Sequence, residues 1–252
     1  MLDFGFYNMD CMEGMKQFPD KHFELAIVDP PYGRKEHGGR NRSGYVKQKN
    51  GSRIYVSDGN YIKGNWDEKP ADAEFFKELF RVSQNQIIWG ENYYSENFGS
   101  GRIIWDKCND GSDQSDCETA YNSMTDRVDI FRYMWRGMMQ GKSITEGWIQ
   151  QGNKALNEKR IHPTQKPVIL YEWQLTTYAK PGWKILDTHV GSASSLIACH
   201  NLGFDYVGFE IDKTYFDMAT KRLEAIKAQR TIFDCGVERT KQQQLSDFIA
   251  TS

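Results

Sequence analysis

The sequence lacks an apolar run long enough to span a membrane, and Met1 to Phe4 lack the basic and apolar regions of a secretory signal. It also lacks closely paired cysteines, because the five that it has are scattered without a CxxC spacing: Cys11, Cys108, Cys117, Cys199 and Cys235. Their scatter argues against a zinc site and against a disulfide framework. We therefore expect a cytoplasmic protein with reduced thiols, no membrane partner and no metal.

An excess of positive charge is missing as well. The formal net charge is -2, so the protein as a whole does not attract nucleic acid, and binding of that kind requires a local basic patch. The 252 residues, 39% of them hydrophobic, are enough to bury a full core. We expect one domain over residues 1–252.

The most informative stretch is Phe23 to Gly33, an apolar run that ends in Asp29, Pro30, Pro31 and Tyr32. This pattern predicts a buried strand that carries Asp29 to the carboxyl edge of an α/β sheet, where ligands bind. The prolines contribute carbonyls without N–H donors, and the tyrosine adds a flat face. Acceptors beside an aromatic ring suit the exocyclic amino group of a stacked nucleobase. A plain proline turn after a core strand is the alternative.

A basic segment follows this turn. Between Arg34 and Lys69 there are nine Lys or Arg (34, 35, 40, 42, 47, 49, 53, 63 and 69) and four acids (36, 58, 67 and 68), a balance of 9 − 4 = +5. Glycines and aromatic residues lie between the charges, a composition typical of loops that contact nucleic acid. We expect a DNA-contacting loop at 33–69 that uses Arg34, Lys35, Arg40, Arg42, Lys47, Lys49 and Arg53. A solvated surface excursion is the other interpretation.

The middle of the chain predicts a helix over Pro70–Val82, strands over Gln86–Gly90 and Arg102–Asp106, and a polar loop with a short helix over Ser112–Met124. A strand over Val128–Trp135 and an irregular segment at 136–160 follow.

Two acids mark further strand ends. Asp10 follows a short strand that begins at Gly5, and it also suits the N-cap of the next turn. Glu210 ends the strand that begins at Asp205, nineteen residues after Gly191 in a strand, turn and helix pattern that begins at Trp183. An acid so placed can accept bonds from both hydroxyls of a ribose. A surface acid is the alternative, and Asp212 suits the cap of a helix from Lys213.

The Asp29-Pro30-Pro31-Tyr32 motif resembles the catalytic motif of the amino-group DNA methyltransferases. The run from His162 to Pro167 (His-Pro-Thr-Gln-Lys-Pro) is similar to the motif that precedes the donor-binding strand in members whose catalytic motif comes first. The motif order resembles the circularly permuted beta class, and the compact length resembles stand-alone phage-type adenine methyltransferases. The resemblance implies an α/β, Rossmann-like fold that uses S-adenosylmethionine, with a mostly parallel mixed sheet and helices on both faces.

The resemblance also implies roles for single residues. Catalysis would use Asp29, Pro30, Pro31 and Tyr32. S-adenosylmethionine would contact Asp10, Cys11, Asp29, His162, Thr164, Lys166, Asp187, His189, Gly191, Ser192, Ala193, Glu210 and Ile211. Thr164 and Lys166 supply a hydroxyl and a cation for the donor's carboxylate, although Thr164 also suits a helix N-cap. Ala193 stands where the family commonly has glycine, and Thr188-His189 where it often has Pro-Phe. We expect a retained donor site with different packing, provided that the φ angle of Ala193 is negative.

The implied reaction transfers a methyl group to N6 of an adenine flipped out of double-stranded DNA. Cytosine N4, an RNA adenine and an inactive nucleic-acid-binding descendant are the alternatives. The segment at 136–160 would recognise the target and, being short, would contact only a few base pairs. A homodimer and a cognate restriction nuclease are further partners that the resemblance allows, in a bacterial or phage-infected cell.

Overall fold

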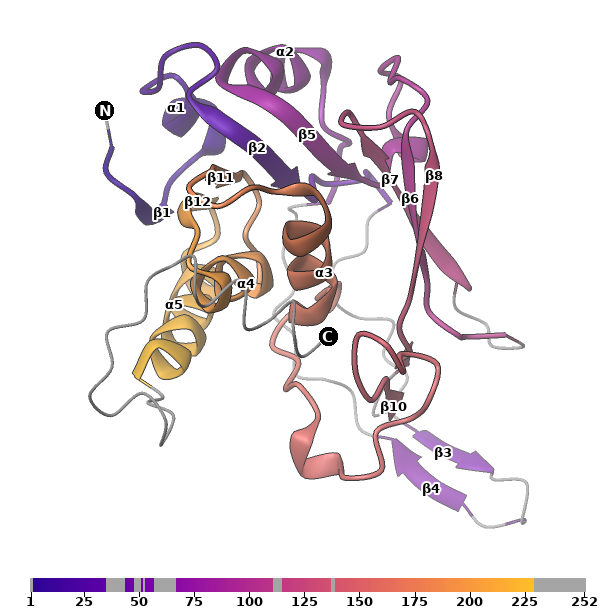
Figure 1. The fold of residues 1–252 in the computed structure, drawn as a ribbon. Coiled ribbons are helices and arrows are strands. Elements are labelled where there is room, and N and C mark those ends of the chain that lie inside the picture. The colour runs from indigo at the N-terminus through magenta and orange to yellow at the C-terminus, as the bar shows by residue number, and fades with distance from the viewer. Residues whose placement is uncertain are drawn as a thin grey trace.

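The computed structural model describes residues 2–34, 44–47, 51, 53–56, 67–110, 115–136 and 139–228. Its main feature is an eight-stranded sheet with the order β1-β12-β11-β2-β5-β7-β6-β8 (Figure 1). The strands are β1 (Gly5–Asn8), β2 (Phe23–Val28), β5 (Ser83–Trp89), β6 (Arg102–Asp106), β7 (Cys117–Asn122), β8 (Val128–Arg132), β11 (Lys184–Asp187) and β12 (Asp205–Glu210).

The first five strands of this order, from β1 to β5, run parallel to one another. Strand β7 is antiparallel to both β5 and β6, and β8 is parallel to β6. The sheet is therefore mixed and mostly parallel, as predicted. Because parallel strands end at the same edge, the residues at or just after the ends of β1, β12, β11 and β2 come together there: Asp10, Glu210, Asp187 and Asp29.

Helices cover both faces of the sheet. Successive side chains of β2 point to opposite faces, and on each face they pack in a hydrophobic core against helices. Leu25 and Ile27 pack with α3 (Val168–Tyr178) and α4 (Ser194–Leu202), whereas Ala26 and Val28 pack with α1 (Cys11–Met15) and α2 (Ala73–Val82) (Figure 1). Helix α5 (Lys213–Ala228) packs on α4, and Asp212 caps it by accepting bonds from two backbone N–H groups. Helix α2 begins one turn later than Pro70, where Asp72 caps it.

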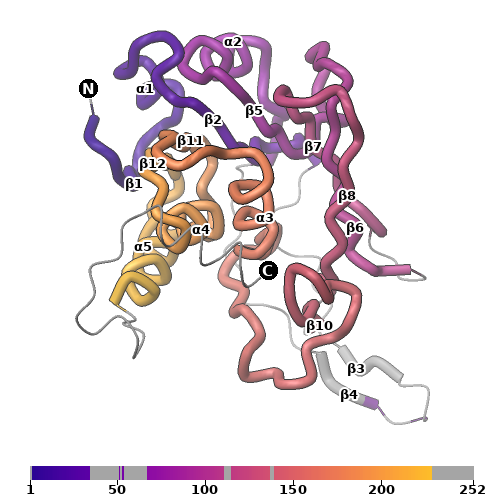
Figure 2. The backbone as a smooth tube through the Cα atoms, in the orientation of Figure 1, coloured from indigo at the N-terminus to yellow at the C-terminus, as the bar shows by residue number. Residues whose placement is uncertain are grey.

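The end of the described chain returns to its beginning. Strand β12 pairs with β1, with Gly5 opposite Val207, and β11 pairs with β2. Figure 2 shows this path as the orange segments lying beside the indigo ones. The strand ends that carry Asp10 and Asp29 are therefore brought next to those that carry Asp187 and Glu210.

One prediction for the middle of the chain is wrong, and another is correct only in part. The short helix expected within Ser112–Met124 is the strand β7, whose Ala120 and Asn122 are buried with the period of two that a strand requires. Pairing on both sides with β5 and β6 outweighs its polar composition. The strand expected over Val128–Trp135 is two strands, β8 and the short β9 (Trp135–Arg136), which pairs with β10 (Met139–Gln140).

The basic segment is more regular than a loop, because it contains the antiparallel hairpin β3 (Gly44–Lys47) and β4 (Arg53–Val56). Lys35, Arg40, Arg42 and Lys49 lie outside the described residues, and only the backbone of Lys47 is described. Short 3-10 turns, η1 (Glu91–Tyr93) and η2 (Lys154–Leu156), complete the elements.

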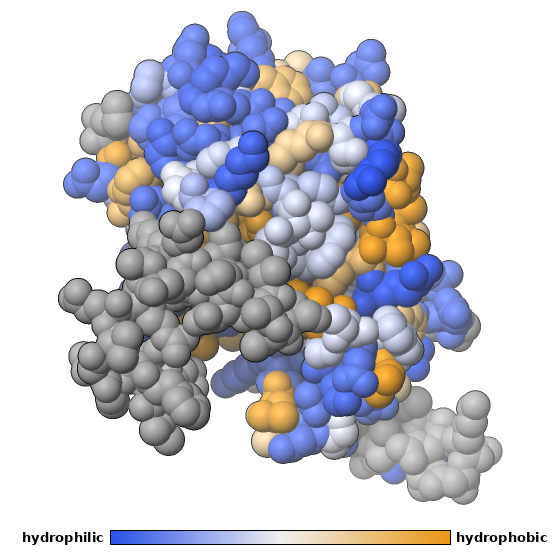
Figure 3. Space-filling model, viewed as in Figure 1, coloured by the Kyte–Doolittle hydropathy of each residue, from blue (hydrophilic) through white to orange (hydrophobic). Residues whose placement is uncertain are grey.

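Strand β8 forms one edge of the sheet, where Figure 3 shows apolar surface at the right of the molecule. Val128 and Ile130 on this strand are 61% and 45% exposed. Among the described residues, none of the helices has the length and apolar character needed to cross a membrane.

Candidate active site

Asp29 lies at the carboxyl end of β2, and the turn after it is held from a distant part of the chain. The buried carboxylate of Asp67 accepts bonds from the backbone N–H groups of Tyr32 (2.7 Å) and Gly33 (2.8 Å). Ala71 N–H donates to the Pro31 carbonyl over 3.2 Å. The basic segment therefore leaves the turn and returns to it at the same point.

Both oxygens of the Asp29 carboxylate have a partner. The Tyr32 hydroxyl donates to Oδ1 over 2.5 Å, and the Lys166 ammonium donates to Oδ2 over 2.5 Å. Lys166 also donates to the Tyr32 hydroxyl oxygen over 3.1 Å. Burial and the nearby Asp29 charge raise the pKa of Tyr32 well above its ordinary value, so the phenol stays protonated. Asp29, Tyr32 and Lys166 thus form one hydrogen-bonded unit.

The Pro30 carbonyl accepts a 2.7 Å bond from the hydroxyl of Tyr94, which is 9% exposed. A carbonyl oxygen has two lone pairs, so this bond leaves one of them for a ligand. The pKa of Tyr94 is raised by burial and by the Asp29 charge, which keeps its hydroxyl a donor.

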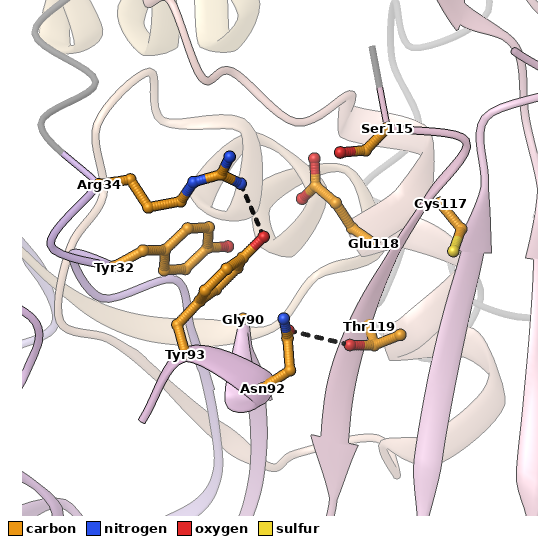
Figure 4. Close-up of a pocket in the computed structure, with 9 residues that line it drawn as sticks. All are labelled: Tyr32, Arg34, Gly90, Asn92, Tyr93, Ser115, Cys117, Glu118 and Thr119. Atoms are coloured by element: carbon orange, nitrogen blue, oxygen red, sulfur yellow. Dashed lines mark hydrogen bonds between the residues drawn. The ribbon is translucent and has the colours of Figure 1, made fainter. Parts of the chain in front are cut away.

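A cavity of about 330 Å³ opens beside this unit (Figure 4). On one side, Tyr32 and Tyr93 stack with ring centroids 4.8 Å apart, and Arg34 donates to the Tyr93 hydroxyl over 2.7 Å. Across from these rings lie Glu118 and Thr119, which come from β7. The whole lining is Tyr32, Arg34, Gly90, Asn92, Tyr93, Ser115, Cys117, Glu118 and Thr119. An aromatic wall opposite polar groups suits a flat heterocycle with exocyclic nitrogen.

Glu118 brings a second carboxylate to Lys166, with Oε2 at 3.1 Å from the ammonium. Its other oxygen pairs with Lys107. Burial would raise the pKa of Glu118, but the charges of Lys166 and Lys107 outweigh it and lower the pKa to about 2. Burial lowers the pKa of Lys166, and the charges of Asp29 and Glu118 raise it by more. Glu118 and Lys166 are therefore both ionised at neutral pH.

The turn between β11 and α4 contains one departure from the sequence prediction. Ala193 has φ +63°, in the left-handed region, and is fully buried. The condition of a negative φ is not met, so this alanine adopts a backbone conformation that favours glycine. Gly191 has φ +55°, and its N–H donates to Glu210 Oε2 over 2.8 Å.

The residues at this edge fit the nucleoside half of the predicted methyl donor. Glu210 accepts one backbone N–H on each oxygen, from Gly191 and from Asp212, and each oxygen keeps a lone pair for a hydroxyl. The next side chain, Ile211, is 62% exposed, an apolar surface beside the acid that suits the face of a purine. Asp10 caps α1 through a 2.7 Å bond from Met12 N–H, which also leaves one carboxylate oxygen for a ligand.

Three neutral groups lie in the same region. Cys11 Sγ is 3.9 Å from His189 Nε2. Burial raises the pKa of Cys11 to about 12 and lowers that of His189 to about 4. His162, 8% exposed, also has a pKa lowered to about 4 by burial, and its Nδ1 accepts from Thr164 N–H over 3.3 Å. These residues offer polarity without charge.

The structure shows the partners of two residues of the motif from His162 to Pro167. Thr164 is not a helix N-cap, because α3 begins after Pro167 and has no side-chain cap. Lys166 points to Asp29 and Glu118 with 4% of its side chain exposed, which leaves the donor's carboxylate without a free ammonium in this structure.

Asp187 gives the fold a dependence on pH. It is 3% exposed, and burial raises its pKa from 3.8 to about 7 against opposing bonds from the Ser195 hydroxyl and His189 N–H. Between about pH 4 and 7 the folded protein therefore holds a proton that the unfolded chain has released. This contribution to stability is fully present below pH 4 and is lost as pH rises to about 7, at most about 4 kcal/mol.

We expect Asp187→Asn to flatten this dependence: its free energy of unfolding falls less between pH 5 and pH 8 than that of the wild type. Urea denaturation at the two pH values measures the difference, with the exposed Asp3→Asn as the control. Equal slopes in the wild type and Asp187→Asn would contradict the assignment.

The structure brings Asp29, Tyr32 and Lys166 together and gathers Asp10, Cys11, His189, Gly191 and Glu210 at the neighbouring strand ends. Of the predicted DNA contacts, Arg34 lines the cavity and Arg53 is exposed. Sequence reasoning missed Asp67, Glu118 and the Tyr93–Tyr32 stack. Asp67 and Glu118 carry no motif, and only their distant partners give them a place in the site.

The chain is similar to known DNA-modifying proteins. A family model described as DNA methylase matches residues 90–221, a range that begins after Asp29. The chain is 25% identical to the type II methyltransferase M.HinfI of Haemophilus influenzae, over 86% of this chain and 67% of that protein. It is 25% identical to the type II methyltransferase M.HpaI of Haemophilus parainfluenzae, over 94% of this chain and 79% of that protein.

The crystal structure of the M1.HpyAVI-SAM complex matches with a TM-score of 0.50 and 18% identity, over 86% of this chain and 98% of that one. This likeness confirms the predicted Rossmann-like fold.

Proposed function

Because the chain belongs to the DNA methylase family, whose members modify the N6 or N4 amino group of a base, we propose that it methylates N6 of an adenine in a short duplex DNA site. The observation that carries this proposal is the bonded unit of Asp29 and Tyr32 beside the Pro30 carbonyl, with Tyr32 also lining an aromatic cavity. The acid at the first position of the motif favours adenine over cytosine by family resemblance.

The residues of this unit address the difficulty of the reaction. An aromatic amine is a weak nucleophile, since its lone pair is delocalised into the ring. The Asp29 carboxylate and the free lone pair of the Pro30 carbonyl accept its two hydrogens and favour a pyramidal nitrogen. The bonds from Tyr32 and Lys166 fix the carboxylate in one orientation, so this geometry exists before the base arrives.

The cavity is the place for the flipped base. Its edge meets Asp29, and its face packs on the stacked pair of Tyr32 and Tyr93. Thr119 and Asn92 line the opposite side and are bonded to each other over 3.2 Å. They offer polar atoms to the ring nitrogens of the base.

S-adenosylmethionine, when bound, supplies an electrophilic methyl group on a sulfonium. Glu210 would accept bonds from its ribose hydroxyls, Ile211 would pack on its adenine, and Asp10 would accept a bond from the adenine amino group. Lys166 reaches the donor's carboxylate only after leaving Asp29 or Glu118. The catalytic strand β2 precedes the donor strand β11 in the chain, which is the permuted motif order.

The DNA backbone meets the basic segment at 33–69, of which Arg34 and Arg53 are described side chains. The segment at 136–160 contacts the bases. Gln140 holds this segment together by bonding the backbone of Glu158 twice, each time over 2.8 Å. Trp148 and Leu156 on it are 58% and 69% exposed, which supports a role in contact with a partner.

The test incubates purified protein with labelled S-adenosylmethionine and unmethylated duplex DNA, then digests the DNA to nucleosides, with Asp29→Ala in parallel. We expect N6-methyl-2′-deoxyadenosine from the wild type and none from the variant. Recovery of N4-methyl-2′-deoxycytidine would show that the target base is cytosine, and transfer to RNA alone would show that the substrate is RNA. No transfer, together with no donor binding by calorimetry, would indicate an inactive descendant.

A further inference from the structure

We propose that Glu118 is a positioning residue for methyl transfer, which acts by holding Lys166 against Asp29 and Tyr32. This inference rests on the proposed function and adds to it a residue that carries no motif in the sequence.

The Lys166 ammonium is surrounded by oxygen atoms of other side chains. A lysine ammonium has three N–H donors and no acceptor. Three acceptors lie within 3.1 Å of it: Asp29 Oδ2 (2.5 Å), Tyr32 Oη (3.1 Å) and Glu118 Oε2 (3.1 Å). Asp29 and Tyr32 accept hydrogen bonds from the ammonium, and Glu118 pairs with it by charge. The Lys166 side chain is 4% exposed, so water has little access to replace a lost partner. Removing the Glu118 carboxylate takes away one of the two anions beside a buried cation.

Lys166 in turn holds the catalytic carboxylate of Asp29 in place. Its other two bonds go to the catalytic carboxylate and to the hydroxyl that donates to the same carboxylate. Lys166 therefore sets the orientation of Asp29 both directly and through Tyr32. Without Glu118, Asp29 is the one carboxylate left beside the ammonium, and Lys166 is no longer held in place from the β7 side, so the orientation that it gives to Asp29 and Tyr32 is loosened.

Position 118 requires a carboxylate, because both of its oxygens face a lysine. Glu118 bridges two lysines, with Lys107 on Oε1 and Lys166 on Oε2. A glutamine of the same size has one carbonyl oxygen, so its NH₂ group would face one of the two cations. Strand β7 fixes this placement, because Glu118 lies opposite Trp105 in the register with β6. Figure 4 shows the Glu118 side chain directed toward the tyrosines across the cavity.

The test compares Glu118→Gln with Glu118→Asp, which keeps the carboxylate. We expect Glu118→Gln to lower kcat by about 10- to 100-fold, the loss typical when a group that orients a reactive residue is removed. The KM for DNA stays near the wild-type value, and Glu118→Asp loses less of its kcat than Glu118→Gln. The matched control is Glu24→Gln, which removes a carboxylate of similar exposure, 23% against 28%, that also pairs with a lysine, Lys184. Glu24 lies at the opposite end of β2, so we expect its kcat to be unchanged.

A pH profile separates positioning from a general loss of structure. The charged and titratable groups facing Lys166 are Asp29 and Tyr32 from the catalytic turn, Glu118 from β7 and His162 from its own segment. Loss of the Glu118 charge lowers the pKa of Lys166, so the alkaline fall in kcat begins at a lower pH in Glu118→Gln than in the wild type.

An unchanged kcat in Glu118→Gln would overturn the proposal. So would an equal loss of kcat in Glu118→Asp and Glu118→Gln if the pH at which kcat falls on the alkaline side stays at its wild-type value. Thermal unfolding of each variant accompanies the kinetics. A wild type that transfers no methyl to DNA would instead overturn the proposed function, which keeps the two failures distinct.

Discussion

Replacing Asp29 with asparagine is expected to slow methyl transfer by about 1,000-fold, within the range for removal of one positioned acid–base or electrostatic group. The amide keeps the size of the side chain but has one acceptor oxygen in place of two. In the wild type, Tyr32 and Lys166 use one bond on each oxygen and leave lone pairs for the base. In the variant these two donors compete with the base for a single oxygen.

Single-turnover transfer to duplex DNA measures this loss, and calorimetry measures donor affinity. Because the carboxylate acts on the base, we expect donor affinity to change far less than the rate. The control is Asp20→Asn, an aspartate before the start of β2 whose side chain is 77% exposed and pairs with Arg81. A wild-type rate in Asp29→Asn would contradict the assigned role.

The second large effect is expected from Gly90→Ala, a substitution of one methyl group. Gly90 ends the path of β5 with φ +68°, and a Cβ built there would lie 2.1 Å from Cε1 of the Tyr32 ring. The ring cannot yield freely, since it stacks on Tyr93 and its hydroxyl is bonded to Asp29 and Lys166. We expect the ring to be displaced and the transfer rate to fall by about 100-fold, the cost of misplacing a reacting group by about 1 Å.

The left-handed backbone itself costs an alanine about 1–2 kcal/mol, and this cost must be separated from the clash. Gly182→Ala is the matched control, because Gly182 has φ +84° and nothing within 4 Å of its built Cβ. In urea denaturation both variants should show the backbone cost, with a further loss in Gly90→Ala from the clash, whereas only Gly90→Ala should lose the rate. Equal activity of the two variants would show that Tyr32 tolerates the displacement.

The sequence was most informative where an apolar run ends in a polar residue. The sequence predicted strands β2 and β12 and the acids at their ends, Asp29 and Glu210. In both places the pattern, an apolar run followed by an acid, is formed by consecutive residues. Strand β7 was missed for the opposite reason. Its residues are mostly polar, and only the neighbours β5 and β6 make it a strand.

The same limit applies to the site. The motif that contains Lys166 was visible, but its bonding partners were not, because Asp29 and Glu118 come from other strands. Asp67 holds the catalytic turn from the far end of the basic segment, and no motif around it marks it as a buried acid. The φ angle of Ala193 is set by the turn that the surrounding elements impose, and a single residue type could not reveal it.

The pairing of β1 with β12 and of β2 with β11 also affects how the chain folds during its synthesis on the ribosome. During synthesis, Phe23–Val28 leaves the ribosome long before Lys184–Asp187, the strand that covers one of its sides. The nascent chain must therefore carry an apolar strand with an open edge until most of the protein has been made. Contacts so distant in sequence form slowly and expose the chain to aggregation, so translation of the final strands, rather than of the catalytic motif, is the event that commits this chain to its fold.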